Sequence, residues 1–198
     1  MGKLDKVLLT LSAVAAAVSL TMCSVSRPEP VPFSHPSASP SCPSASIAPP
    51  APSSEVRFSP KGGCLSAIEE FVGGSRKTVR VMAYGFTSKA VAGALVAMRK
   101  QGVDVQVVLD ESNRTSKYSA LPDLLAGGVP TFLDSSHAIM HDKVVIVDGE
   151  AVETGSYNFT VAAEDSNAEN CLFLRDLVLA RSYGEEWDKH KSHSAPAQ

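Results

Sequence analysis

The sequence lacks an excess of charge of either sign. Its 198 residues carry 18 Lys and Arg against 21 Asp and Glu, which gives a net charge of −3. Residues 55–198 hold 15 Lys and Arg against 19 Asp and Glu, so we expect no broad basic surface for nucleic acid there. Local positive charge could still suffice to bind a phosphate.

The sequence also lacks a hydrophobic run long enough to span a bilayer comfortably. Residues 7–20 are apolar, but the run is short, and Lys3 and Lys6 precede it. We therefore predict a signal peptide in residues 1–26. The protein should be exported to the periplasm or secreted.

Two processing routes are compatible with residues 1–26. Small residues at 24–26 would suit cleavage by the ordinary signal peptidase. The alternative is a lipoprotein signal that leaves a lipid anchor on Cys23, although Met22 is bulkier than the residue usually found before such a cysteine.

Proline is scarce outside one segment. Residues 27–54 hold nine of the thirteen prolines, mixed with serine and alanine. This composition cannot bury a core and predicts an extended, disordered linker. The linker would either hold the following domain off a membrane or be a leader with no special role.

Residues 55–198 are long enough for one hydrophobic core but not for two. We predict strands at 56–58, 78–84, 103–109, 129–133, 144–147, 151–154 and 169–174. We predict helices at 64–71, 89–101, 119–126 and about 176–189. This alternation indicates an α/β fold in which helices cover a β-sheet.

Residues 141–158 contain a predicted β-hairpin. Two strand-like segments flank Asp148-Gly149, the dipeptide preferred in a two-residue type I′ turn. Because side chains alternate along a strand, His141 and Lys143 should share one face. The hairpin would bring them close to Ser156 and Asn158 at its other end. A base, a cation and two neutral polar groups would then meet, and this combination suits a phosphate.

This region resembles the HKD motif of the phospholipase D superfamily, in His141-x-Lys143-x4-Asp148 followed by Gly155-Ser156-x-Asn158. The stretch from Phe159 to Asn170 is similar to the small single-motif bacterial endonucleases of that superfamily. The resemblance covers residues 55–190, including Ala83-Tyr84-Gly85-Phe86-Thr87. It implies a mixed β-sheet flanked by helices on both faces.

The same residues have the chemistry that phosphodiester cleavage needs: a nucleophile, stabilisation of the phosphoryl oxygens and an acid for the leaving oxygen. His141 could attack when it is neutral, and Lys143 and Asn158 could hold non-bridging oxygens with help from Ser156. The resemblance implies a phosphohistidine intermediate on His141. It also implies that Glu169 hydrogen-bonds this histidine and fixes its tautomer. No metal or other cofactor is expected.

Two nearby features have a structural interpretation as well as a functional one. A helix over residues 159–164 would add its free N–H groups to an anion site. Asp148 belongs to the turn and lies on the opposite face from His141 and Lys143. We assign it a structural role despite its place in the motif.

The chain has a single copy of the motif, whereas superfamily active sites use two, with one histidine attacking and the other protonating the leaving group. The remaining histidines begin no second copy; they are His35, His137, His190 and His193. The resemblance therefore implies a C2 homodimer that shares one active site.

Other histidines and cysteines have weaker functional interpretations. His137 and His141 have the spacing of zinc ligands on a helix, but no glutamate lies between them and Lys143 would repel a cation. Residues 190–193 are expected to be an exposed polar tail. Cys64 and Cys171 could pair in an exported protein, but we favour two buried thiols.

The substrate is the least determined property. Arg114, Lys117 and Tyr118 lie in a predicted loop, 111–118, which either contacts backbone phosphates and bases or is solvated. The resemblance favours a sequence-nonspecific, metal-independent endonuclease acting on DNA or RNA. The alternative is a phospholipase D, although no long apolar or amphipathic segment is available to lift a lipid from a bilayer. A second alternative is a non-catalytic nucleic-acid-binding protein, which would not need the nucleophile.

Overall fold

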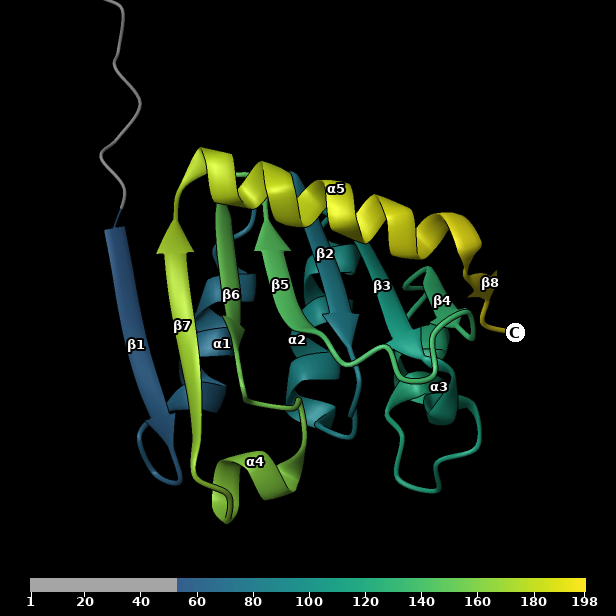
Figure 1. Ribbon diagram of the computed structural model, residues 1–198, viewed down its shortest axis with the longest axis horizontal. Helices are drawn as coiled ribbons and strands as arrows, with labels where there is room; N and C mark the ends of the chain where they lie inside the picture. The colour runs from purple at the N-terminus through teal and green to yellow at the C-terminus, as the bar shows by residue number, and fades with distance from the viewer. Residues whose placement is uncertain (1–52) are drawn as a thin grey trace, which may run out of the picture. The chain divides into compact units, whose positions relative to one another are not determined.

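Eight strands form one mixed sheet in the computed structural model, which describes residues 53–198 (Figure 1). The strands are β1 (Ser53–Ser59), β2 (Thr78–Ala83), β3 (Asp104–Asp110), β4 (Thr131–Asp134), β5 (Lys143–Val147), β6 (Ala151–Gly155), β7 (Glu169–Arg175) and β8 (Ala195–Pro196). Their order is β1-β7-β6-β5-β2-β3-β4-β8. Strands β2, β3 and β4 are parallel to one another, and the other neighbours are antiparallel. The predicted signal peptide and nearly all of the predicted linker lie outside the described residues.

Helices cover both faces of this sheet, as predicted. They are α1 (Cys64–Gly73), α2 (Lys89–Lys100), α3 (Leu121–Ala126), α4 (Val161–Asp165) and α5 (Leu177–His193), with a 3₁₀ turn, η1 (Glu111–Arg114). Helices α1, α2 and α3 pack on one face, and α5 crosses the other (Figure 1). Within residues 53–198, no helix combines the length and the apolar character needed to cross a membrane.

Strand β5 is apolar from Val144 to Val147 because both of its faces are buried. In β5, Val145 and Val147 belong to the core beneath α1, α2 and α3, whereas Val144 and Ile146 belong to the core beneath α5. Trp187 of α5 is buried in the second core, and its indole nitrogen donates to the carbonyl of Val81 at 3.0 Å. This hydrogen bond satisfies the polar group of a large buried aromatic side chain.

The predicted β-hairpin is confirmed. Strands β5 and β6 pair antiparallel, with Val147 opposite Ala151. Asp148 and Gly149 form the turn with φ values of 56° and 66°, the left-handed conformation that a type I′ turn requires at both positions.

Several details differ from the sequence expectations. Strand β8 was not predicted, and α4 begins at Val161 instead of Phe159. Thr160 caps α4 by accepting a hydrogen bond from the backbone N–H of Ala163. The expected exposed tail at 190–193 is wrong for His190, which is buried on α5, whereas Ser192 and His193 are exposed at the end of the same helix.

The interpretation of Cys64 and Cys171 as free thiols is also wrong. They form a disulfide between the first residue of α1 and strand β7, with 6.1 Å between their Cα atoms. That separation lies within the usual range for a disulfide. The packing of α1 against the sheet brings together two residues 107 positions apart.

Glu153 is a buried acid in the middle of β6. It lies opposite Val145 on one neighbouring strand and Phe173 on the other, and none of its surface is exposed. Neither carboxyl oxygen has a hydrogen-bond partner among the described residues. Burial raises the pKa of Glu153 to about 8, so the side chain is protonated in the folded protein at neutral pH.

We predict that Glu153 makes the folded protein less stable as pH rises. Its pKa is about 8 when folded and 4.5 for an unperturbed glutamate, so the unfolded chain loses this proton first. Between these two values the free energy of unfolding should fall by about 1.4 kcal/mol per pH unit from this group alone. Below pH 4.5 Glu153 should cause no loss in the free energy of unfolding, and above pH 8 the loss that it causes should no longer increase.

Glu153→Gln removes the titration and nearly preserves the shape of the side chain. Urea unfolding of both proteins from pH 5 to pH 9 should show the variant gaining stability relative to the wild type up to about pH 8. Parallel stability profiles for the two proteins would contradict the assignment.

Candidate active site

The predicted residues of the motif lie at one end of the inner strands, where β2 and β6 end and β5 and β7 begin (Figure 1). His141 and Lys143 come from the start of β5, Ser156 and Asn158 follow β6, and Glu169 opens β7. Antiparallel pairing of β5 with β6, and of β6 with β7, places these chain segments side by side.

His141 and Lys143 contact each other directly. The Lys143 Nζ atom lies 3.2 Å from His141 Nδ1 and donates to the His141 carbonyl at 2.5 Å. An ammonium group has no lone pair, so the first contact is a hydrogen bond only when His141 Nδ1 is unprotonated. His141 is exposed, and the ring of Tyr84 lies 4.9 Å away between centroids. If Nδ1 accepts from Lys143, the proton of a neutral imidazole lies on Nε2, so attack by Nε2 on a phosphate needs the other tautomer, with the proton on Nδ1.

The backbone around His141 is held from two sides. The backbone N–H of Tyr84 donates to the Asp142 carbonyl at 3.0 Å. The Asp110 carboxylate, at the end of β3, accepts from the N–H of Met140 at 2.9 Å. His141 therefore lies between two anchored residues, although its own side chain faces solvent.

Lys143 is a buried cation with competing influences on its charge. Burial lowers its pKa, while the negative charges of Asp142 and Glu169 act in the opposite direction. The net effect places the pKa below the ordinary lysine value. An ammonium with few water contacts interacts strongly with an incoming anion.

Asn158 faces the loop that follows β2. Its Oδ1 atom accepts from the backbone N–H of Gly85 at 3.4 Å, which orients the amide. A Cβ atom on Gly85 would lie 3.4 Å from Asn158 Oδ1 and 3.2 Å from the Thr160 side chain. Glycine therefore permits the close approach that positions the amide.

Ser156 and Glu169 form a small hydrogen-bonded group. The Ser156 hydroxyl donates to Glu169 Oε2 at 2.6 Å and accepts from the N–H of Asn170 at 3.1 Å. Asn167 Nδ2 donates to the other oxygen of Glu169 at 3.0 Å. Within the described chain, Glu169 thus bonds Ser156 and Asn167, and its role toward His141 stays a prediction.

Asp148 has a structural role, as expected. Its carboxylate accepts from the backbone N–H groups of Arg76, Lys77 and Thr78 at 2.7–3.2 Å. Partial burial alone would raise the pKa of Asp148, but these hydrogen bonds and the charge of Lys77 hold it below the usual range. The residue joins the hairpin turn to the start of β2, at the end of the strands away from His141.

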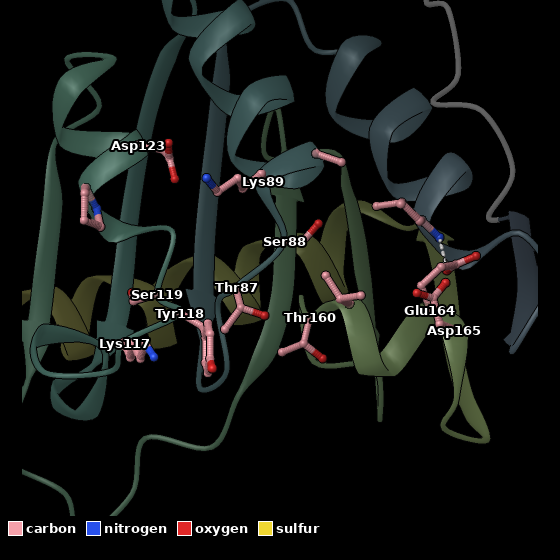
Figure 2. Close-up of a pocket in the computed structure, with 14 residues that line it drawn as sticks. Thr87, Ser88, Lys89, Lys117, Tyr118, Ser119, Asp123, Thr160, Glu164 and Asp165 are labelled. Atoms are coloured by element: carbon pink, nitrogen blue, oxygen red, sulfur yellow. Dashed lines mark hydrogen bonds between the residues drawn. The ribbon is translucent and has the colours of Figure 1, made fainter.

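A pocket of about 870 Å³ lies beside the site (Figure 2). Lys117, Tyr118 and Lys89 line it, together with Thr87 and Thr160, which follow the ends of β2 and β6. Lys117 and Tyr118 were predicted from the sequence, whereas Lys89 was not. Lys89 lies in no recognisable motif, and only the fold brings the start of α2 to this pocket.

Arg114 has a different environment. It lies on η1 and does not line the pocket, and its Nε atom is 2.6 Å from Glu111 Oε1. The hydrogen bond and charge of Glu111 raise the pKa of Arg114. A role in substrate binding stays a prediction for this residue.

Comparisons with known proteins find several that are similar to this chain. Residues 68–191 match the family model described as cardiolipin synthase, PLD-like domain. The chain is 36% identical over 137 residues to a phospholipase D of Rickettsia bellii, which covers 69% of this chain and 68% of that protein. It is 33% identical over 124 residues to a mitochondrial cardiolipin hydrolase of Xenopus laevis, which covers 63% of this chain and 59% of that protein.

One solved structure is similar over nearly its whole length. It is Nuc from Salmonella typhimurium, described as a phospholipase D family member. The two chains are 38% identical, with a TM-score of 0.72 over 74% of this chain and 99% of that one.

We predict that Asp148→Asn destabilises the fold without removing the chemistry. Asparagine tolerates the left-handed backbone, so the change affects mainly the charge and the acceptor geometry toward residues 76–78. The free energy of unfolding should fall by about 1–3 kcal/mol. Activity per folded molecule should be unchanged, measured below the unfolding transition. Lost turnover with unchanged stability would instead assign Asp148 to the chemistry.

Proposed function

We propose that this chain, which belongs to the phospholipase D superfamily and is a hydrolase acting on phosphodiester bonds, is a sequence-nonspecific endonuclease that works through a phosphohistidine on His141. The observation that carries the proposal is the contact of His141 Nδ1 with Lys143 Nζ at 3.2 Å. It pairs an exposed nucleophile, His141, with a buried cation, Lys143.

The proposed reaction has two displacements at phosphorus. An imidazole nitrogen of His141 forms a bond to phosphorus while the bond from phosphorus to the leaving oxygen breaks. Lys143 and the Asn158 amide would hold the non-bridging oxygens, whose charge increases in the transition state. Water would then attack the phosphohistidine, release the phosphate product and restore the free imidazole.

The neighbouring pocket offers groups that nucleic acid could use, although the carboxylates of Asp123, Glu164 and Asp165 also line it and would repel a polyanion. Lys89 and Lys117 could contact backbone phosphates, and the ring of Tyr118, which is 73% exposed, could stack on a base. Such contacts carry little sequence information, so cleavage should be nonspecific. The choice between DNA and RNA would depend on contacts to the sugar.

A phospholipid substrate is the second candidate. Ile139 and Val161 are apolar and more than half exposed, and each lies within three residues of a predicted site residue. The relatives named phospholipase D and mitochondrial cardiolipin hydrolase point in the same direction. A lipid acyl chain could contact these two side chains while its head group lies near His141.

We also propose that the protein is exported. The predicted signal peptide lies in residues 1–26, outside the described part of the chain. The disulfide between Cys64 and Cys171 supports an oxidising compartment such as the periplasm or the cell exterior. A lipid on Cys23 would additionally tether the protein to a membrane.

We predict that His141→Ala abolishes cleavage while leaving DNA binding intact. Loss of the nucleophile should reduce turnover by roughly 10³-fold or more. Full-length protein would be assayed with plasmid DNA, RNA and cardiolipin vesicles, with EDTA added together with the substrate. His35→Ala, in the predicted linker, is the matched histidine control and should keep full activity.

Each substrate outcome has a distinct meaning. DNA or RNA cleavage by the wild type, lost in His141→Ala, would support the nuclease. Hydrolysis of cardiolipin alone would replace it with the lipid candidate. DNA binding with no turnover of any substrate would favour the non-catalytic binding protein.

We further propose that two chains share one active site, because the described residues contain one HKD motif. His141 of the second chain would then be the acid that protonates the leaving oxygen. Wild-type and His141→Ala chains would be unfolded together in equal amounts and refolded so that subunits exchange. If each site needs both histidines, only wild-type homodimers work, and they make up about one quarter of the dimers. Activity should then be about one quarter of that of the same total amount of wild-type protein. About one half would mean that each chain works independently. Mixing without refolding is the control.

A further inference from the structure

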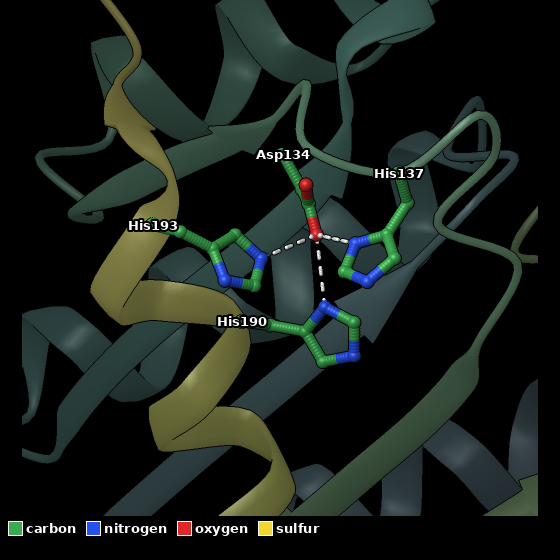
Figure 3. Close-up of side chains that lie close together, drawn as sticks. All are labelled: Asp134, His137, His190 and His193. Atoms are coloured by element: carbon green, nitrogen blue, oxygen red, sulfur yellow. Dashed lines mark hydrogen bonds and ion pairs between the residues drawn. The ribbon is translucent and has the colours of Figure 1, made fainter.

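Four side chains converge where the end of α5 meets the end of β4, in an arrangement that the proposed chemistry does not use (Figure 3). Asp134, at the end of β4, is fully buried. Its Oδ2 atom lies 3.0 Å from His137 Nδ1, 2.8 Å from His190 Nδ1 and 3.0 Å from His193 Nε2. One carboxylate oxygen therefore faces three imidazole nitrogens.

Distant parts of the chain supply these residues. His137 lies in the loop between β4 and β5, which leads to His141. His190 and His193 lie three positions apart on the last turn of α5, so they share one face of the helix. The cluster thus joins the C-terminal helix to the loop that carries the predicted nucleophile.

Hydrogen bonding alone accounts poorly for this arrangement. A carboxylate offers about two lone-pair directions on each oxygen, so three N–H donors exceed the capacity of Oδ2. The three rings also lie 5.0–5.5 Å apart between centroids, where several protonated imidazoles would repel one another. A cation would instead accept one lone pair from each nitrogen and one from the oxygen.

The donor set suits zinc. Three imidazoles and one carboxylate are ordinary zinc ligands, and four protein ligands are typical of a structural site. The four ligand atoms lie within 4.8 Å of one another. A tetrahedral ion about 2.0–2.1 Å from each atom needs ligand atoms about 3.3 Å apart. The hydrogen-bonded pairs would separate by a few tenths of an ångström, and a pair at the 4.8 Å limit would close by about 1.5 Å through rotation of the histidine side chains.

The surroundings of the cluster resemble those of a prepared metal site. Ser136 N–H donates to Asp134 Oδ1 at 2.9 Å, which leaves Oδ2 directed at the histidines. His190 points Nδ1 at Asp134 and Nε2 at the Asp142 carboxylate, 3.4 Å away. Metal-bound histidines commonly donate their second N–H to a carboxylate in this way. The C-terminal end of a helix such as α5 also favours a cation.

We propose that Asp134, His137, His190 and His193 bind one structural zinc ion that holds α5 against the loop carrying His141. This revises the expectation of no metal, which considered His137 only with His141. The ion has no part in the proposed displacements at phosphorus, and the inference does not depend on which phosphodiester is cleaved. Through His190 and Asp142, the ion would steady the residue next to His141.

Zinc binding tests this directly. Full-length protein would be loaded with Zn²⁺, dialysed against metal-free buffer and analysed for metal content. The wild type should retain one zinc per chain, and Co²⁺ in its place should give the visible absorption of a tetrahedral site. His137→Gln and His193→Gln should each weaken Zn²⁺ binding by roughly 100-fold or more. These side chains are 47% and 33% exposed, so both variants should fold, as circular dichroism would verify.

Two further variants separate the roles of neighbouring residues. His141→Ala lies outside the cluster and should retain the full zinc content. Asp142→Asn removes the carboxylate behind His190 and should weaken Zn²⁺ binding by about 10- to 100-fold. A wild type that retains no zinc, or a folded His137→Gln/His193→Gln double variant that binds it equally well, would overturn the proposal.

Discussion

The register of the β5–β6 hairpin is the constraint on which the candidate site depends. Side chains alternate between the two faces of a strand, so a slip of one residue would turn His141 and Lys143 together to the other face, away from Ser156 and Asn158. The Asp148-Gly149 turn sets this register, and the Asp148 carboxylate secures it through three backbone N–H groups at the start of β2. A structural residue at one end of the hairpin therefore positions the chemical residues at the other end.

Burial on both faces makes this hairpin a rigid support. Strand β5 pairs with β2 and β6 and contributes side chains to both cores, so it cannot shift without disturbing all of them. His141 itself lies just before this buried strand, where the chain meets solvent. The site thus combines a fixed backbone with an accessible nucleophile, which is the combination that attack on a large phosphodiester requires.

The loop between β4 and β5 connects the site to the rest of the molecule. Asp110 holds Met140 from β3, Tyr84 holds Asp142 from β2, and the cluster around Asp134 holds His137 against α5. Each contact comes from a different element of the fold. Changes in α5, far from His141 in the sequence, could therefore alter the geometry of the site through this loop.

Local sequence patterns were enough to predict most of the fold and the centre of the site. The alternation of strands and helices, the Asp148-Gly149 turn and the grouping of His141 with Lys143 depend on residues close together in the chain. Tertiary structure alone decided the pairing of Cys64 with Cys171, the partners of Glu169 and the convergence of His190 and His193 on Asp134. Most of these contacts join residues that lie tens of positions apart in the chain, and only the packing of helices on the sheet brings them together. Spacing cannot reveal such contacts, because the physical cause of each lies in the arrangement of other elements.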